Sequence, residues 1–479
     1  MRSIFLTLSL FFSCIVNAQV KSSFIGSWMG KLNVGPGLRI VLHIEPAGDG
    51  QYSATLDSPD QQVNGIKTEG VIVSGDSIRI NIPSINGRIA GRMVNDSTIS
   101  ASLYQGGPVP VSFRRMARGE AVQGPARPQT PQPPFPYRAD SVVYKSRDGK
   151  LTYGATITIP NGKGPFPSII LITGSGAQDR DENILGHRMF AVLSDMLTRN
   201  GYLVLRADDR GVGVSTGDFN MATSADFAAD VKEHLYYLQQ LPQVDTKRIG
   251  LLGHSEGGMI APMVAAERKD LAFLILLAAP GVPVVQLMAE QNIAVLRSAG
   301  LDSNAATTYG RFFRDAVPAL VKAPTKDSAV SLMANALKEW RATTHPNIVM
   351  AATGVRNDST AKGYVNTMVN SLYTPWYRYF ISFDPQPWLA RVKTKVLALN
   401  GERDIQVLAA SNLEGIRKGL GKARNKDFTI RYLPGLNHLF QTCKSCSLNE
   451  YGQLTETISP AALDVIREWL LEKVPPVKQ

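Results

Sequence analysis

One short stretch constrains the fold of this chain more than any other, because it joins a strand pattern, a glycine–serine turn and a helix pattern. The apolar residues 249–252 run into Gly-His-Ser-Glu-Gly at 253–257, and a helical pattern of small residues follows. A serine raised above a sheet edge needs a turn too tight for a Cβ two residues to either side. Gly253 and Gly257 meet that need. The flanking patterns favour a nucleophile elbow, with Ser255 as nucleophile, over a glycine-rich turn with an incidental serine.

A serine nucleophile needs a base, and the order along the chain at such an elbow is serine, then Asp or Glu, then histidine. Four of the six histidines precede Ser255, and His345 lies in a polar stretch with no strand pattern before it. His438 follows the strand-like residues 428–433. The sequence therefore predicts His438 as the catalytic base.

The acid that orients this histidine is expected at the end of another strand between the serine and the histidine. Residues 396–400 form such an apolar run, and the loop 401–407 follows them. We predict Asp404 in this loop as the partner of His438. Glu402 is the alternative, although it could equally be a solvated loop charge.

Acyl transfer also needs preorganised backbone N–H groups at the position where the oxyanion forms. One is expected from Glu256, directly after the nucleophile, and the other from the loop 173–181, which follows an apolar strand pattern. Ser175 and Gly176 are both candidates for this second donor. The glycine-containing loop lacks the G-K-[ST] and G-x-G-x-x-G continuations that would favour a phosphate site.

The N-terminal residues are typical of an export signal. Residues 1–18 contain Arg2, then an apolar run from 4 to 16 that is too short to span a membrane, then small residues. Cys14 raises a lipoprotein alternative, but the residues before it are a poor lipidation context. We expect a cleaved signal and a periplasmic or secreted protein without stable membrane insertion.

At 479 residues the chain is too long for one ordinary core, so two domains are expected. Residues 20–116 show alternating patterns for about eight short strands, which predict a small antiparallel barrel or sandwich, with no cluster of titratable residues. Residues 117–137 contain six prolines and are expected to form an extended linker.

The remaining residues, 138–475, have near-continuous apolar strand patterns separated by helical ones, which is typical of a sheet buried on both faces. An antiparallel pair at 141–145 and 153–159 is expected to open this sheet. The segment at about 281–385 interrupts the alternation and is predicted to be a helical cap. Its aromatic end, residues 372–383, could line an apolar pocket over the serine or belong to the core of the cap itself.

The net charge of the chain bears on which partners it could bind. The formal net charge is +11, but it is spread along the chain without a run of Lys or Arg, so we expect no nucleic-acid partner.

Cys443 and Cys446 lie just beyond His438. A disulfide is plausible in an exported protein, and reduced thiols remain the alternative. A metal site would need further ligands nearby, so none is expected.

Several motifs taken together resemble the α/β-hydrolase superfamily, especially exported bacterial carboxylesterases and serine-aminopeptidase-like hydrolases. The matching segments are residues 174–181, 208–215, 253–258, 401–407 and 436–441. Gly-Ser-Trp-Met-Gly at 26–30 is similar to the start of lipocalin-like domains, which often precede such enzymes. The resemblance implies a mostly parallel sheet flanked by helices, and hydrolysis of a small-molecule acyl ester without a cofactor.

Other functions stay open on the same fold, namely a serine peptidase or aminopeptidase, a thioesterase, or a binding protein without turnover. The complete set of Ser255, Asp404 and His438 favours an enzyme. Residues 372–383 contain several aromatic residues and Arg378, and the first acidic residue after them is Asp384. An aromatic and cationic rim of this kind around a substrate pocket favours short-to-medium acyl esters over substrates with a free amino group. The sequence does not predict an oligomeric state.

Overall fold

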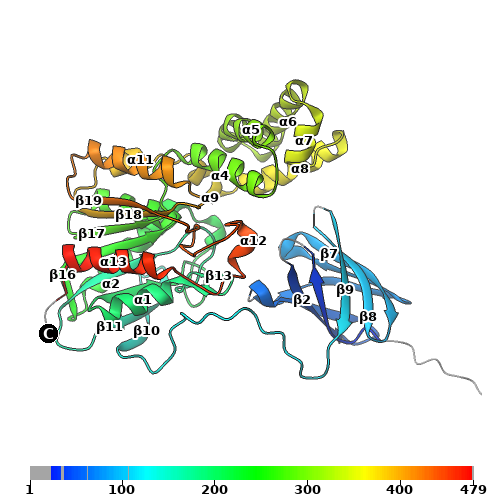
Figure 1. The fold of residues 1–479 in the computed structure, drawn as a ribbon, viewed down its shortest axis with the longest axis horizontal. Coiled ribbons are helices and arrows are strands. Elements are labelled where there is room, and N and C mark those ends of the chain that lie inside the picture. The colour runs from blue at the N-terminus through cyan, green and yellow to red at the C-terminus, as the bar shows by residue number, and fades with distance from the viewer. Residues whose placement is uncertain (1–22, 34–36, 62, 106, 477–479) are drawn as a thin grey trace, which may run out of the picture. The chain divides into compact units, whose positions relative to one another are not determined.

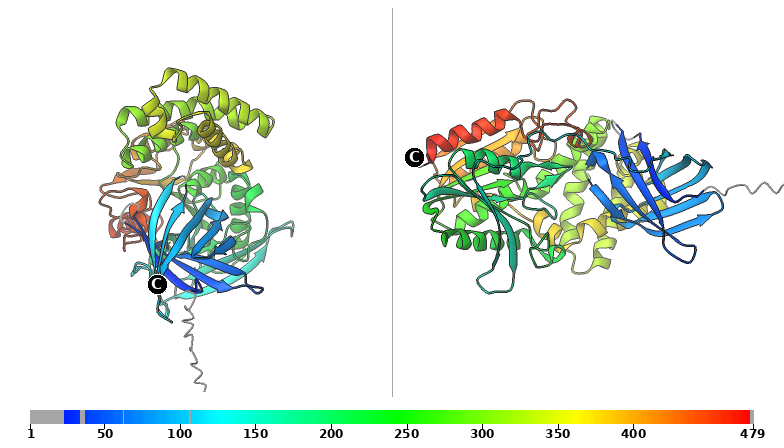
Figure 2. Two further views of the ribbon diagram at one scale, coloured as in Figure 1. Left: turned by 90° about the vertical axis from the view of Figure 1, so that its right-hand side faces the viewer. Right: turned by 90° about the horizontal axis from the view of Figure 1, so that it is seen from below.

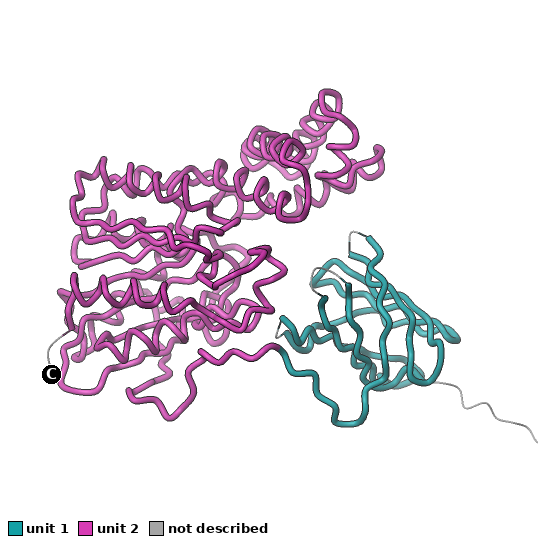
Figure 3. The backbone as a smooth tube through the Cα atoms, in the orientation of Figure 1, with its two compact units in different colours: residues 1–124 teal, residues 125–479 magenta. Residues whose placement is uncertain are grey.

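The computed structural model describes residues 23–33, 37–61, 63–105 and 107–476. The chain divides into two compact units between residues 124 and 125 (Figure 3). Each unit is described separately below. The predicted export signal at 1–18 lies outside the described residues.

The first unit is a single antiparallel sheet of nine strands rather than about eight. The strands are β1 (Gly26–Leu32), β2 (Leu38–Pro46), β3 (Tyr52–Ser58), β4 (Val63–Lys67), β5 (Glu69–Ser74), β6 (Ser77–Ile82), β7 (Gly87–Asn95), β8 (Thr98–Tyr104) and β9 (Pro108–Arg115). Their order is β4-β3-β2-β1-β9-β8-β7-β6-β5, so the last strand returns to pair with the first. Alternate residues of these strands bury a shared apolar core, as the period-two patterns predict.

The tryptophan of the Gly-Ser-Trp opening is an anchor of this core. Trp28 is fully buried, and its indole N–H donates to the carbonyl oxygen of Phe24 over 2.8 Å. The guanidinium of Arg115 lies 4.1 Å from the centre of the indole ring, close enough for a cation–π contact. The indole ring of Trp28 is buried, its N–H is hydrogen-bonded and a guanidinium stacks on it. These contacts explain why this short motif begins the domain.

The expectation that this unit has no titratable cluster is wrong. Ser27 Oγ lies 2.8 Å from Nδ1 of His43, and Nε2 of His43 lies 2.8 Å from a carboxylate oxygen of Asp57. The three residues come from β1, β2 and β3, where neighbours on one face of a sheet are close enough to pair. Strand register creates this cluster, and register is not visible in the spacing of the residues.

The predicted linker is not a free spacer throughout, because its second part packs on the second unit. The guanidinium of Arg127 donates to the carbonyl oxygens of Leu185 (2.9 Å), Gly452 (2.6 Å) and Leu454 (2.8 Å). The side-chain amide of Gln129 donates to the carbonyl of Ile458 over 2.7 Å. A proline-rich segment without a core of its own is thus ordered by side-chain hydrogen bonds to carbonyl groups distant in sequence.

The second unit contains an eight-stranded sheet. Its strands are β10 (Arg138–Lys145), β11 (Thr152–Ile159), β12 (Phe166–Ile172), β15 (Leu203–Ala207), β16 (Val244–His254), β17 (Phe273–Leu277), β18 (Lys395–Gly401) and β19 (Phe428–Leu433). The order is β10-β11-β15-β12-β16-β17-β18-β19. β10, β11 and β15 pair antiparallel, and the other neighbouring pairs are parallel. The predicted opening antiparallel pair is confirmed.

Helices cover both faces of this sheet (Figure 1). They are α1 (Met189–Arg199), α2 (Ser224–Gln239), α3 (Glu256–Glu267), α11 (Ala409–Lys422) and α13 (Pro460–Lys473). Ile169 and Leu171 of β12 pack in one core with α1 and α13, whereas Ile170 and Ile172 pack in another with α2, α3 and α11. Residues on both faces of β12 are therefore buried, which explains the continuous apolar pattern of this strand. The predicted α/β-hydrolase fold is confirmed.

The predicted insertion lies between β17 and β18 and is helical. It contains α4 (Val284–Ser298), α5 (Ser303–Lys322), α6 (Lys326–Thr343), α7 (Pro346–Thr353), α8 (Asp358–Leu372), α9 (Pro375–Ile381) and α10 (Gln386–Leu389). Figure 2 shows α5–α8 gathered into a layer of their own within the second unit. No helix in the described ranges is both long and apolar enough to cross a bilayer.

Candidate active site

Ser255 stands at the junction of β16 and α3, in a strained backbone conformation. Its φ and ψ are 52° and −116°, a region that non-glycine residues rarely adopt. A Cβ on Gly253 would lie 2.1 Å from the carbonyl oxygen of Gly257. A Cβ on Gly257 would lie 2.1 Å from the carbonyl oxygen of Ile172 in β12. Both glycines are therefore required by the close approach of backbones around the serine.

His438 and Asp404 form a buried pair at the carboxyl ends of the strands. Nδ1 of His438 lies 2.7 Å from Oδ2 of Asp404. The other oxygen of Asp404 accepts the backbone N–H groups of Gln406 (2.7 Å) and Val407 (2.9 Å). These donors hold the carboxylate so that it accepts a hydrogen bond from Nδ1–H, which leaves Nε2 of His438 as the basic nitrogen.

The alternatives weighed from the sequence lie elsewhere. Glu402 is exposed, and its carboxylate accepts the backbone N–H of Gly435 over 3.1 Å. His345 caps the start of α7, where Nδ1 accepts the N–H of Asn347 over 3.3 Å. The structure thus brings Asp404, and not Glu402, to His438.

The loop after β12 lies directly against Ser255. A Cβ on Gly174 would lie 3.3 Å from the Cβ of Ser255. The N–H of Gly174 itself donates to Oε1 of Glu182 over 2.6 Å, and the next residues, Ser175 and Gly176, are exposed. On the other side, Glu256 is the first residue of α3, where backbone N–H groups have no partner within the helix. Gly174 and Glu256 therefore approach Ser255 from two segments, and the oxyanion donors stay a prediction.

Residues 208–210, Asp-Asp-Arg, hold this loop in place. Asp209 accepts the hydroxyl of Thr173 over 2.7 Å and the backbone N–H of Gln178 over 2.9 Å. Asp208 accepts the guanidinium Nε–H of Arg180 over 2.9 Å. Desolvation raises the pKa of Asp209 to about 7. In the sequence this motif is visible only as part of the family pattern, and its position directly after β15 is the signal that could have indicated a supporting role.

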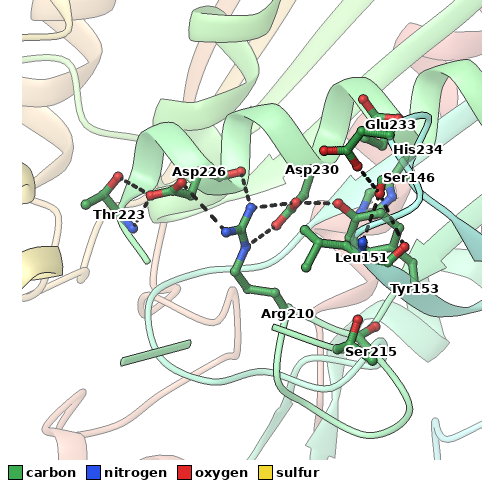
Figure 4. A network of polar contacts seen from close by, with 12 residues as sticks. Ser146, Leu151, Tyr153, Arg210, Ser215, Thr223, Asp226, Asp230, Glu233 and His234 are labelled. Carbon is green, nitrogen blue, oxygen red and sulfur yellow. Dashed lines mark hydrogen bonds and ion pairs between the residues drawn. The ribbon is translucent and has the colours of Figure 1, made fainter. Parts of the chain in front are cut away.

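The third residue of the motif ties the segment after β15 to α2, where a residue of β11 bonds the same partner (Figure 4). Arg210 donates two hydrogen bonds to the carboxylate of Asp230, each 2.7 Å long. The hydroxyl of Tyr153 donates to the same carboxylate over 2.6 Å. A bidentate pair with a third donor fixes the geometry of the loop more firmly than a single contact.

The cap reaches the elbow through one aromatic residue. The indole N–H of Trp376 in α9 donates to Oε1 of Glu256 over 2.9 Å, and the hydroxyl of Ser224 donates to the same oxygen over 2.6 Å. The Glu256 side chain is buried, and desolvation raises its pKa. Sequence analysis assigned only the backbone of Glu256 a role and missed this side-chain contact.

The expected aromatic and cationic rim is wrong in its cationic part. The guanidinium of Arg378 donates to the carbonyl oxygen of Val321 over 2.7 Å and lies 4.6 Å from the ring centre of Tyr373. Tyr377 and Phe380 are buried in the apolar core that the cap shares with the sheet. Most of this aromatic segment therefore serves packing, and Arg378 completes the hydrogen bonding at the end of α5.

The loop after His438 is closed by a disulfide between Cys443 and Cys446. The backbone N–H of Cys443 donates to the carbonyl oxygen of Gly435 over 3.3 Å, so the disulfide loop is tied to the residues just before the histidine. Of the alternatives left by the sequence, the structure has the paired cysteines.

The chain is similar to several known proteins. A family model described as X-Pro dipeptidyl-peptidase (S15 family) matches residues 148–411, more than half of the chain. Esterase EstD of Thermotoga maritima is 34% identical over 152 residues, which are 32% of this chain and 36% of that protein. The chain thus spans about a third of the length of this relative.

Solved structures resemble the chain at low sequence identity. An esterase from Pyrococcus furiosus has a TM-score of 0.42 at 14% identity, with 74% of this chain and 99% of that one covered. A proline iminopeptidase from Mycobacterium smegmatis has a TM-score of 0.41 at 16% identity, with 70% and 98% covered. The match to the family model spans the elbow and its supporting loops, and the chain belongs to the X-Pro dipeptidyl-peptidase (S15) family of hydrolases.

Proposed function

We propose that this protein is a serine hydrolase that cleaves short-to-medium acyl carboxylic esters through an acyl-enzyme. The observation that carries the proposal is the buried hydrogen bond of 2.7 Å between His438 and Asp404. That bond orients His438, whose ring centre lies 4.9 Å from that of His254, the residue directly before the strained serine. The relative named Esterase EstD supports the choice of an ester substrate.

The proposed reaction uses the residues of this chain alone. Nε2 of His438 takes the proton of the Ser255 hydroxyl while Oγ attacks the acyl carbon. The oxyanion accepts hydrogen bonds from the backbone N–H groups of Glu256 and of Ser175 or Gly176. The protonated histidine gives its proton to the departing alcohol, and the acyl group stays on Oγ. His438 then deprotonates a water molecule, which releases the carboxylic acid and restores the serine.

Peptide hydrolysis is the second candidate, because the family description names a dipeptidyl-peptidase. A substrate with a free ammonium group needs a carboxylate open to it near the nucleophile. The carboxylate of Glu256 is adjacent but buried, and Oε1 is already bonded to Trp376 and Ser224. Because this carboxylate is already hydrogen-bonded within the protein, it supports an uncharged acyl group as substrate. A thioester also carries an uncharged acyl group, so it remains a variant of the first candidate.

A labelling experiment separates an enzyme from a binding protein. A fluorophosphonate probe should label the wild-type protein and fail to label a folded Ser255→Ala variant. Unlabelled wild type would favour a binding role without turnover. Among active preparations, p-nitrophenyl butyrate should be cleaved with a higher kcat/KM than any aminoacyl or prolyl anilide. The reverse ranking would overturn the ester assignment in favour of a peptidase.

We also propose that the protein acts outside the cytoplasm. The disulfide between Cys443 and Cys446 supports this, because structural disulfides persist mainly in oxidising compartments. Intact-mass measurement of the protein from a periplasmic or culture fraction should show loss of residues 1–18. Recovery of the uncleaved chain in the cytoplasm alone would contradict export.

A further inference from the structure

Behind the candidate catalytic pair lies a second buried pair, formed by Glu182 and His254. Their side chains are 0% and 1% exposed, and Nδ1 of His254 lies 2.9 Å from Oε1 of Glu182. The other ring nitrogen, Nε2, lies 3.1 Å from the backbone carbonyl oxygen of His438. His254 immediately precedes Ser255, and its ring centre is 4.9 Å from that of His438.

These contacts determine the protonation state of His254. A carbonyl oxygen can only accept, and Oε1 of Glu182 also accepts the N–H of Gly174 over 2.6 Å. A neutral imidazole has a single N–H and could satisfy one of its two contacts, whereas an imidazolium satisfies both. With Glu182 ionised, both contacts are satisfied only by a cation at His254, balanced by that carboxylate.

The charged groups around the ring agree with that state. Burial by itself lowers the pKa of His254, but the charge and hydrogen bond of Glu182, the carbonyl of His438 and the charge of Asp404 raise it overall. Glu182 comes from the segment before β13 (Asn183–Ile184), while Asp404 and His438 come from the loops after β18 and β19. Two other buried histidines contrast with this, because desolvation lowers the pKa of His187 and of His234 to about 4.

We infer that Glu182 and His254 are positioning residues, an ion pair that locks the oxyanion loop and the backbone of the base His438 to the same point. One carboxylate oxygen holds the N–H of Gly174, which lies against Ser255, and through the imidazolium the pair reaches the carbonyl of His438. Glu182 itself has a φ of 47°, a strained conformation that this placement maintains. The inference rests on the proposed function, because it assigns these residues to that site.

The role predicts a loss in kcat rather than in KM. The pair does not line a surface that binds substrate, and it fixes groups whose contacts strengthen in the transition state. Changing the partners that orient metal-ligating side chains typically costs 10- to 100-fold in affinity or activity, and we expect the same scale here. Glu182→Gln removes the negative charge but retains an oxygen and an N–H of the same size, so the neutral ring could still donate from Nε2 to His438.

The test combines nuclear magnetic resonance with kinetics on the full chain. With ¹⁵N-labelled histidine at pH 8, wild type should show one buried imidazole protonated on both nitrogens. This signal should be absent from His254→Ala, and in Glu182→Gln it should change to a neutral ring. We expect kcat on p-nitrophenyl butyrate to fall at least about 10-fold in Glu182→Gln and further in His254→Ala, with KM within about twofold. His234→Asn, at a buried but neutral histidine, is the control and should retain kcat.

Each outcome decides the inference. A neutral His254 in wild type at pH 8, or an unchanged kcat in Glu182→Gln, would overturn it. If His254→Ala failed to fold, Glu182→Gln and the wild-type spectrum would still give the answer. A folded wild type that no fluorophosphonate labels at Ser255 would instead refute the proposed function, whereas the protonation state is read independently of activity.

Discussion

The indole N–H of Trp376 in the cap donates to the side chain of Glu256, the residue directly after Ser255, over 2.9 Å. The acceptor oxygen is buried and also accepts the hydroxyl of Ser224. The cap helix α9 is thereby part of the support of the elbow and not merely a cover above it. Loss of this one indole N–H in the cap should therefore affect the turn that holds Ser255.

Trp376→Phe tests this contact, because it removes the N–H donor and keeps an aromatic ring to stack on Phe380, now 4.8 Å away. A lost hydrogen bond at a buried acceptor typically costs about 1–3 kcal/mol, and we expect a fall of that size in the free energy of unfolding in urea. Trp388→Phe is the matched control, since Trp388 stacks on Arg391. An equal loss in both variants would show that the hydrogen bond to Glu256 is unimportant.

Ser255 and His438 should behave as one catalytic unit. Ser255→Ala and His438→Ala should each lower kcat on the order of 10⁴-fold or more, without loss of the folded circular dichroism spectrum. The double variant should be barely slower than either single variant, because the base has no role once the nucleophile is gone. Multiplicative losses in steady-state rates would contradict the shared role.

The two acidic residues of the loop after β18 should differ sharply. Asp404→Asn replaces the acceptor for Nδ1 of His438 and should lower kcat far more than Glu402→Gln, whose parent side chain is exposed and bonds only the N–H of Gly435 among the contacts described. Initial rates on p-nitrophenyl butyrate measure this. A more damaging change at Glu402 would show that the acid is misassigned.

The packing of the linker predicts where the chain can be shortened. A chain of residues 125–479 should retain esterase activity, because every proposed catalytic group lies in the second unit. A chain of residues 138–479 loses Arg127 and Gln129 with their hydrogen bonds to four carbonyl groups, and it should melt at a lower temperature. Equal melting temperatures by calorimetry would show that residues 125–137 contribute nothing to stability.

Asp209 should make stability depend on pH. Its pKa in the folded chain is about 7, above the ~3.9 of an unfolded aspartate, so the folded state holds a proton that the unfolded state has lost. The contribution to the free energy of unfolding is therefore largest below about pH 4 and decreases up to about pH 7.

Asp209→Asn removes that titration, so the stability of the variant relative to wild type should rise between pH 4 and pH 8. We expect about 2 kcal/mol, because partial solvent exposure screens the larger value that full burial would give. Urea titrations at several pH values measure the change in this difference and not its offset, which also contains the hydrogen bonds altered by the substitution. A difference that stays constant with pH would contradict a raised pKa.

Local patterns determined much of this protein. The elbow could be predicted because the steric need for Gly253 and Gly257 acts over five residues, and both glycines indeed face backbone atoms too close for a Cβ. The strands of the second sheet could be predicted because burial on both faces leaves a continuous apolar run. The order of serine, acid and histidine along the chain, with the strand patterns, pointed to His438 and to the loop that holds Glu402 and Asp404, and the structure places Asp404 2.7 Å from His438.

The tertiary structure alone decided which distant side chains meet. His254 and Glu182 are 72 residues apart, and Trp376 and Glu256 are 120 residues apart. Neither pair has a periodicity or spacing that a local pattern could reveal, because the order of strands in the sheet and the packing of the cap bring the partners together. The same reason explains why Arg378, expected at a pocket rim, bonds to α5 instead. Local sterics specify the turns and elements, whereas the partner of a buried charge is set by the topology that buries it.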